Sequence, residues 1–149
     1  MTEQVFDGRL GVENEMVGSG SVRLGYAAGE QGRGVVYARI LQADAVSVVR
    51  ATFRIEAKHS HDSLVLGLEA VGAIAPALRK RVRAVDLHVE DGLASALTGR
   101  REIPAQLFLA YVRARCALNA FARCTVRQGE GERDLVARAI AEVSLRVAA

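Results

Sequence analysis

The chain has 149 residues, of which half are apolar and a quarter are charged, and its formal net charge is +3. This length suits one domain with a buried core and is too short for two, so residues 1–149 are expected to form a single domain. The composition excludes a disordered or fibrous protein. A mildly basic charge permits binding to a polyanion but does not by itself argue for it.

The sequence predicts a cytoplasmic location. The first residues are polar and acidic, which is unlike a signal peptide. No apolar run approaches the ~20 residues that a membrane helix needs, so no membrane partner is expected. The two cysteines, Cys116 and Cys124, fit no zinc or redox motif. We expect them to be reduced thiols in the core of a cytosolic protein.

The N-terminal third is typical of an antiparallel meander. Residues 1–20 are interpreted as an N-terminal extension or an extra strand. After them, apolar and polar residues alternate with the period of a strand in three segments separated by short turns. Strands joined by such short turns pair antiparallel. The three predicted strands span 21–28, 35–41 and 46–57.

The middle of the chain predicts a helix and then a strand. Apolar residues recur with a period of 3.6 residues over 62–75, and Pro76 is expected to end or kink this helix. Residues 84–89 alternate as a strand and are flanked in sequence by apolar helical stretches, so this strand is expected inside the sheet. A short helix is predicted at 93–97.

The C-terminal part predicts a long helix, a strand and a final helix. Pro104 stands at a favourable first position of a helix over 104–121. A strand follows at 123–127, and the last helix spans 132–147. The complete order, β-β-β-α-β-α-α-β-α, predicts an α/β fold with a five-stranded mixed sheet and helices on both faces. Right-handed crossovers would make the first, fourth and fifth strands parallel neighbours.

Acidic residues stand at two element boundaries. Glu90 and Asp91 follow the strand at 84–89, and ligands in open α/β folds bind at the carboxyl ends of strands. Asp134 begins the last helix. Each position also has a purely structural interpretation, because a strand can end in an acidic turn and an acid stabilises the first turn of a helix. Both interpretations stay open from the residues alone.

Three segments resemble the ribonuclease H family. Residues 121–139 look like its closing strand, turn and helix, and Asp134 falls on its fourth catalytic carboxylate. Residues 85–93 resemble its fourth strand, with Glu90 in the place of a catalytic Asp and Asp91 beside it. Residues 66–70 resemble the middle of its first helix. The order of elements is similar over about 21–148, which implies a ribonuclease H-like fold.

The chain departs from the family at the other two carboxylates. The family's first strand ends in Asp-Gly, and the order of elements aligns that pair with Ala28 and Gly29. The family's first helix carries a catalytic Glu about nine residues before the Leu-Glu of its middle, and this count reaches Ser60. In a second register Asp7 is the first acid and a later strand is an insertion.

The resemblance implies two-metal hydrolysis of RNA in RNA–DNA hybrids, with Mg²⁺ or Mn²⁺ held by carboxylates. Because two carboxylates are missing, we interpret the chain as a nucleic-acid-binding domain with a degenerate site. An active nuclease and a protein-interaction scaffold are the alternatives. The catalytic candidates are Asp7, Glu90, Asp91 and Asp134, of which the last three are the metal ligands. Candidate phosphate contacts are Arg79, Lys80, Arg81, Arg100 and Arg101.

Overall fold

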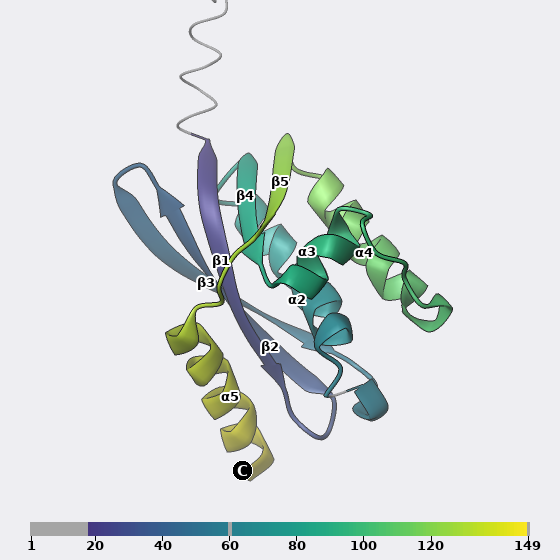
Figure 1. Ribbon diagram of the computed structural model, residues 1–149. Helices are drawn as coiled ribbons and strands as arrows, with labels where there is room; N and C mark the ends of the chain where they lie inside the picture. The colour runs from purple at the N-terminus through teal and green to yellow at the C-terminus, as the bar shows by residue number, and fades with distance from the viewer. Residues whose placement is uncertain (1–17, 60, 149) are drawn as a thin grey trace, which may run out of the picture.

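A computed structural model describes residues 18–59 and 61–148. It shows a five-stranded sheet with helices on both of its faces (Figure 1). The candidate strand and acid near Asp7 lie outside the described residues, as does Ser60. No helix in the described part of the chain is long and apolar enough to cross a membrane.

The first three strands form the predicted antiparallel meander. They are β1 (Ser19–Ala28), β2 (Arg33–Gln42) and β3 (Ala45–Arg54). The turn between β1 and β2 closes with a hydrogen bond from Gly29 N to Arg33 O. Gly32 in this turn has a φ of 80°, a conformation that glycine adopts without steric cost. The glycine-rich stretch therefore makes a hairpin turn.

The remaining strands, β4 (Ala84–Val89) and β5 (Arg123–Gln128), complete the sheet in the order β3-β2-β1-β4-β5. β4 pairs parallel with β1 on one side and with β5 on the other. The predicted mixed sheet, its parallel members and the interior place of β4 are confirmed.

The first long helix, α2 (Ser63–Arg79), is longer than predicted. Asp62 caps it, because its carboxylate accepts hydrogen bonds from the N–H groups of Leu64 and Val65. The expectation that Pro76 ends the helix is wrong. Proline has no N–H, so the carbonyl of Gly72, four residues earlier, loses its helical hydrogen bond. Pro76 is exposed, so a water molecule can donate to this carbonyl instead.

Three further helices follow at the predicted places. They are α3 (Asp91–Leu97), α4 (Phe108–Asn119) and α5 (Arg133–Ala148). A single 3-10 turn at Ala105–Leu107 precedes α4, so the predicted helix over 104–121 begins with a tighter turn. Another such turn, Ala57–His59, takes the last residues of the predicted third strand.

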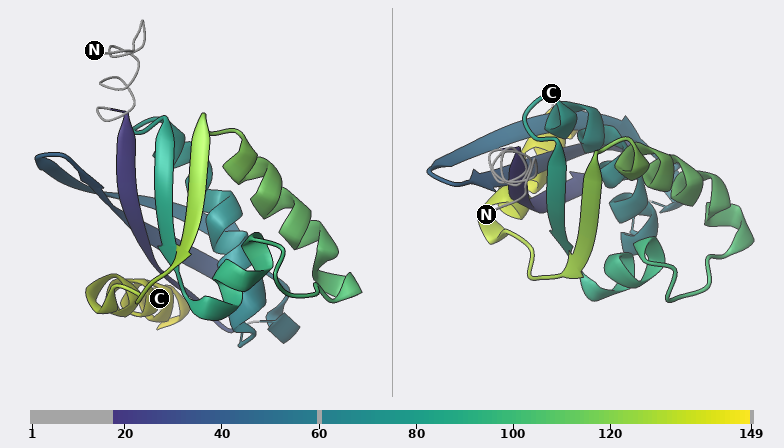
Figure 2. Two further views of the ribbon diagram at one scale, coloured as in Figure 1. Left: turned by 45° about the horizontal axis from the view of Figure 1, so that its top comes forward. Right: turned by 90° about the horizontal axis from the view of Figure 1, so that it is seen from above.

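The helices divide the core between the two faces of the sheet (Figure 2). On one face α2 packs against β1, β2 and β3, and α4 packs on α2. This larger core includes the fully buried side chains of Ile40, Leu68 and Leu87. On the other face α5 buries Leu135 and Ala139 against β1 and β2.

The second face depends on a very close approach of α5 to β1. A Cβ atom at Gly25 would lie 2.5 Å from the backbone N of Val136 and 2.6 Å from the backbone carbon of Leu135. Only a glycine lets the helix backbone reach the strand at this point. The contact fixes the first turns of α5 over the sheet.

Both cysteines are free, but only one is partly covered. Cys124 is half-buried, and burial is the main cause that raises the pKa of its thiol. Cys116 is exposed, so its prediction as a core thiol is wrong. The buried face of α4 carries Ala114 and Leu118. Cys116 lies between these two positions in sequence and so falls on the opposite side of the helix.

We expect Gly25→Ala to lower the free energy of unfolding by at least about 2 kcal/mol, because the added methyl group meets helix backbone that cannot rotate away. Gly72→Ala is the matched control. It adds the same methyl group inside α2 where nothing lies within 4 Å, and it should raise stability by about 0.5–1 kcal/mol. Urea denaturation measures both, and equal stabilities would contradict the close approach.

Candidate functional site

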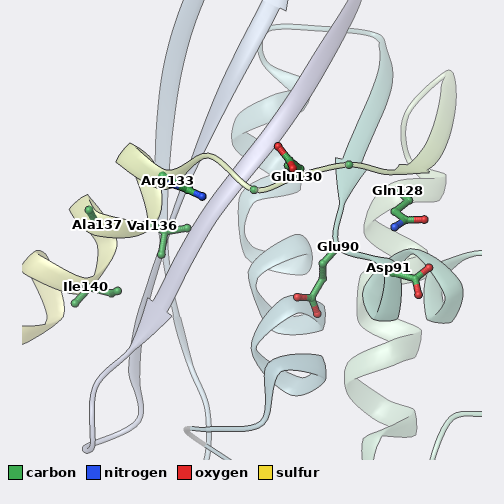
Figure 3. A pocket seen from close by; sticks show the side chains of 10 residues that line it. Glu90, Asp91, Gln128, Glu130, Arg133, Val136, Ala137 and Ile140 are labelled. Atoms are coloured by element: carbon green, nitrogen blue, oxygen red, sulfur yellow. The ribbon is translucent and has the colours of Figure 1, made fainter.

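A groove with a volume of about 800 Å³ lies where β4 and β5 end and α5 begins (Figure 3). Glu90 and Asp91 line it from the end of β4, and Gln128 and the residues after it line it from the end of β5. The first turns of α5 form the opposite side. They contribute Arg133 and the apolar side chains Val136, Ala137 and Ile140.

Glu90 and Asp91 have different roles in the local structure. Asp91 is the first residue of α3, where a carboxylate stabilises the positive end of the helix. Glu90 stands at the capping position, but its side chain makes no capping hydrogen bond. Its backbone carbonyl starts the helix by accepting the N–H of Ala94. The structural role of an acidic turn therefore explains Asp91 and leaves the Glu90 carboxylate without one.

Glu90 also lines a second cavity, of about 310 Å³, together with Gly25, Tyr26 and Ser63. Burial, and secondarily the negative charge of Glu90, raise the pKa of the Tyr26 hydroxyl above its usual value. The tyrosine is therefore neutral at physiological pH. β1 therefore brings an apolar ring with a neutral hydroxyl to the cavity that Glu90 lines.

The register between β1 and β4 shows which residue of β1 is level with Glu90. The last parallel pair is Arg23 with His88. Two residues further along both strands, Gly25 comes level with Glu90, and Ala28 lies three residues beyond it. Ala28, which the order of elements aligns with the family's first carboxylate, therefore does not lie level with Glu90. The position that faces Glu90 is a glycine whose side-chain space is filled by α5.

Asp134 is turned toward β2 and binds an arginine. Its carboxylate accepts hydrogen bonds from both terminal nitrogens of Arg39, with Nη2–Oδ2 at 2.6 Å and Nη1–Oδ1 at 3.3 Å. The same guanidinium binds Glu132, with Nη1–Oε2 at 2.6 Å. The hydrogen bond from Arg39 is the main cause that lowers the pKa of Asp134, and the arginine's positive charge adds to it.

The structure does not bring the predicted metal ligands to one point. Within residues 18–59 and 61–148, no three His, Cys, Asp or Glu side chains are grouped so as to hold a metal ion. Glu90 and Asp91 line the groove, whereas Asp134 is held by Arg39. The residues present therefore do not fit the two-metal centre that the resemblance implies, and Asp7 lies outside the described part.

Sequence reasoning missed Arg39 and Glu132. A signal was present in β2, where Arg39 follows Val35 and Tyr37 at alternate positions that face α5. A cation in such a row needs a carboxylate partner when it is covered. A related anchor holds the segment after β5, because Arg23 Nη1 donates a hydrogen bond to the backbone oxygen of Glu130 at 3.1 Å.

The predicted phosphate contacts lie in two places. Arg79, Lys80 and Arg81 are exposed at the end of α2 and lead into the start of β4. Arg100 and Arg101 follow α3, which begins directly after the end of β4. Arg101 lies beside Gly92, since its Nη1 is 3.3 Å from where a Cβ atom of Gly92 would stand. The first group and Arg101 therefore lie at opposite ends of β4.

The strand order, the parallel pairs and the two helix layers define a ribonuclease H-like fold, and solved structures agree. RNase H1 from Halobacterium salinarum matches with a TM-score of 0.63 and 19% identity, covering 87% of this chain and 99% of that one. The N-terminal RNase H domain of a Mycobacterium tuberculosis protein, solved as a fusion with maltose-binding protein, matches with a TM-score of 0.56 and 11% identity, covering 83% and 97%.

A viral protein shares the fold as one part of a longer chain. The prototype foamy virus protease-reverse transcriptase matches with a TM-score of 0.52 and 12% identity, covering 87% of this chain and 20% of that one. No family model and no curated protein sequence matches the chain. At these identities the comparisons establish the fold alone.

Arg39→Gln should raise the pKa of Asp134, because the main hydrogen bond to its carboxylate is lost. Since the native pKa is depressed, the pair stabilises the fold above the unfolded-state pKa, and this contribution is lost as the pH falls through the folded-state pKa. NMR titration of the Asp134 carboxyl carbon measures the change. Arg100→Gln, an equal change of charge at an arginine that binds no acid in the described residues, should leave this pKa in place.

Proposed function

We propose that the chain is a ribonuclease H-like nucleic-acid-binding domain whose carboxylate site is degenerate. One observation is the main support for a site that does not catalyse hydrolysis. The place on β1 that is level with Glu90 is Gly25, and α5 backbone occupies the space that a carboxylate would need there. No rotamer change can supply an acid at a position that cannot hold a Cβ atom.

The pairing of Asp134 supports the same conclusion. Two-metal hydrolysis needs carboxylate oxygens that converge on two hard cations. Both oxygens of Asp134 are engaged by Arg39, which brings its own positive charge to the place where a metal ion would have to approach. A guanidinium and a divalent cation repel each other, so the bound arginine weakens the hold of Asp134 on a metal ion.

Nucleic-acid binding is supported by the fold and by the distribution of cations. Proteins that share the architecture include two named as RNase H proteins or domains. The net charge of +3 is compatible with a polyanionic partner. Aromatic residues make up only 5% of the chain and tryptophan is absent, so contacts to phosphates are favoured over base stacking.

The proposal predicts binding of an RNA–DNA hybrid without cleavage in millimolar Mg²⁺ or Mn²⁺. The logarithm of the binding constant should fall linearly with the logarithm of salt concentration. Arg39→Gln should not create activity, because freeing Asp134 leaves Gly25 unchanged. Gel analysis of a labelled hybrid, with a ribonuclease H as positive control, measures cleavage.

Cleavage by the wild type that is abolished in Asp134→Asn would contradict the degenerate site and favour an active metal-dependent nuclease. Loss of that activity in Asp7→Asn as well would identify Asp7 as its first acid. Absence of any binding at low salt would contradict the nucleic-acid role and favour an interaction scaffold.

A further inference from the structure

We propose that the nucleic-acid backbone binds a basic cluster at the end of the sheet opposite the carboxylate groove. The cluster consists of Arg79, Lys80, Arg81 and Arg83. This inference rests on the proposed function and names the surface that performs it. Arg79 ends α2 and Arg83 directly precedes β4, whereas the groove lies where β4 ends and α5 begins (Figure 1).

The backbone holds this cluster in one arrangement. The N–H groups of Arg81 and Val82 both donate to the carbonyl of Leu78, at 2.9 Å each. The Val82 side chain is buried with 2% of its surface exposed, and Arg83 N donates to Gly18 O at 2.8 Å. The four basic side chains therefore project from a short, anchored turn. Such preorganisation lowers the entropy lost on binding.

The cations of the cluster differ from the arginines on the faces of the sheet and on α4. Four arginines elsewhere are each held by an acid of the chain: Arg39, Arg50, Arg113 and Arg127. By contrast, the four side chains of the cluster are exposed and pair with no acid among the residues that the structure describes. The sequence from 70 to 85 contains no Asp or Glu at all. No acid of the described residues therefore competes with an external anion for their charge.

Helix stabilisation explains only part of the cluster. Cations in the last turn of a helix interact favourably with its negative end, which accounts for Arg79 and Lys80. Arg81 and Arg83 stand beyond the helix and gain nothing from it. Four like charges close together repel one another, and a polyanion would relieve that repulsion.

The chemistry of the cluster favours phosphates over bases. Arginine and lysine side chains contact phosphate oxygens in any sequence. Phe121 stands next to Ala122, whose N–H donates to the carbonyl of Arg83, but it is buried at 7% exposure and offers no stacking surface. We therefore infer binding to a duplex backbone without sequence preference.

The experiment compares two variants of the full chain that remove equal charge. The first is Arg79→Gln, Lys80→Gln, Arg81→Gln. The control is Arg33→Gln, Arg54→Gln, Arg138→Gln, three exposed arginines elsewhere that also pair with no acid in the described residues. Fluorescence anisotropy with labelled RNA–DNA hybrids of two unrelated sequences gives the affinity at several salt concentrations, and circular dichroism confirms that each variant is folded.

We expect the cluster variant to lose at least about tenfold in affinity on both sequences. The slope of log affinity against log salt should become shallower by about 2–3, since each phosphate contact contributes about 0.9. The control should change the slope by less than about 1. Arg83 lies outside the helix, so Arg83→Gln can be tested even if the triple variant unfolds. This single change should make the slope shallower by about 1.

The other outcomes separate the two proposals. If the wild type binds but both triple variants lose affinity equally, binding follows net charge and the cluster is not the surface. A larger loss in the control would place the surface near the paired residues Arg33 and Arg54 of β2 and β3 instead. Tighter binding to phosphatidylserine vesicles than to the hybrids at equal salt would contradict a nucleic-acid partner. Absence of duplex binding by the wild type at low salt would overturn the proposed function itself, whereas equal losses in the two triple variants would overturn only the assignment of the surface.

Discussion

The contact between α5 and β1 at Gly25 determines most of what the candidate site can do. It lets helix backbone lie directly on a strand, at a distance that no residue with a side chain permits. The contact fixes the first turns of α5 over the sheet, where Asp134 and Glu132 reach Arg39 on β2. The same contact removes the side-chain position that is level with Glu90. One packing constraint thus joins Asp134 of α5 and Glu132, just before α5, to an arginine and leaves Glu90 beside Tyr26 and glycine.

The ion pairs of Arg39 matter more because they occupy the carboxylates of Asp134 and Glu132 than because they stabilise the fold. Exposed ion pairs contribute little, and the Asp134 side chain is 62% exposed. What matters is that a guanidinium supplies planar, bidentate donors that match a carboxylate. A carboxylate held this way has both of its oxygens engaged by a cation of the chain. Glu90, Asp91 and Glu130 line the groove, but no three acids of the described residues are grouped so as to hold a hard cation.

The fold could be predicted from the sequence because its strands and helices have clear apolar periods, and the ribonuclease H-like order of elements followed from them. The predictions failed where solvent exposure or contacts between residues far apart in sequence determine the structure. Pro76 stays inside α2 because its exposed side tolerates a missing hydrogen bond. The place of the first carboxylate depends on the register of β1 against β4, which the pattern of either strand alone does not contain. The Arg39–Asp134 pair joins residues 95 positions apart, beyond any local spacing rule.

The distribution of charge over the sheet makes the two ends of the molecule electrostatically different. The groove carries the carboxylates of Glu90, Asp91 and Glu130 against the single cation Arg133, so without bound metal it repels phosphates. In an active two-metal nuclease the cations reverse that repulsion. Here the carboxylates do not converge, so nothing in the described residues would reverse it. Acids thus gather at the groove and basic residues at the turn between α2 and β4, a separation that a net charge of +3 does not reveal.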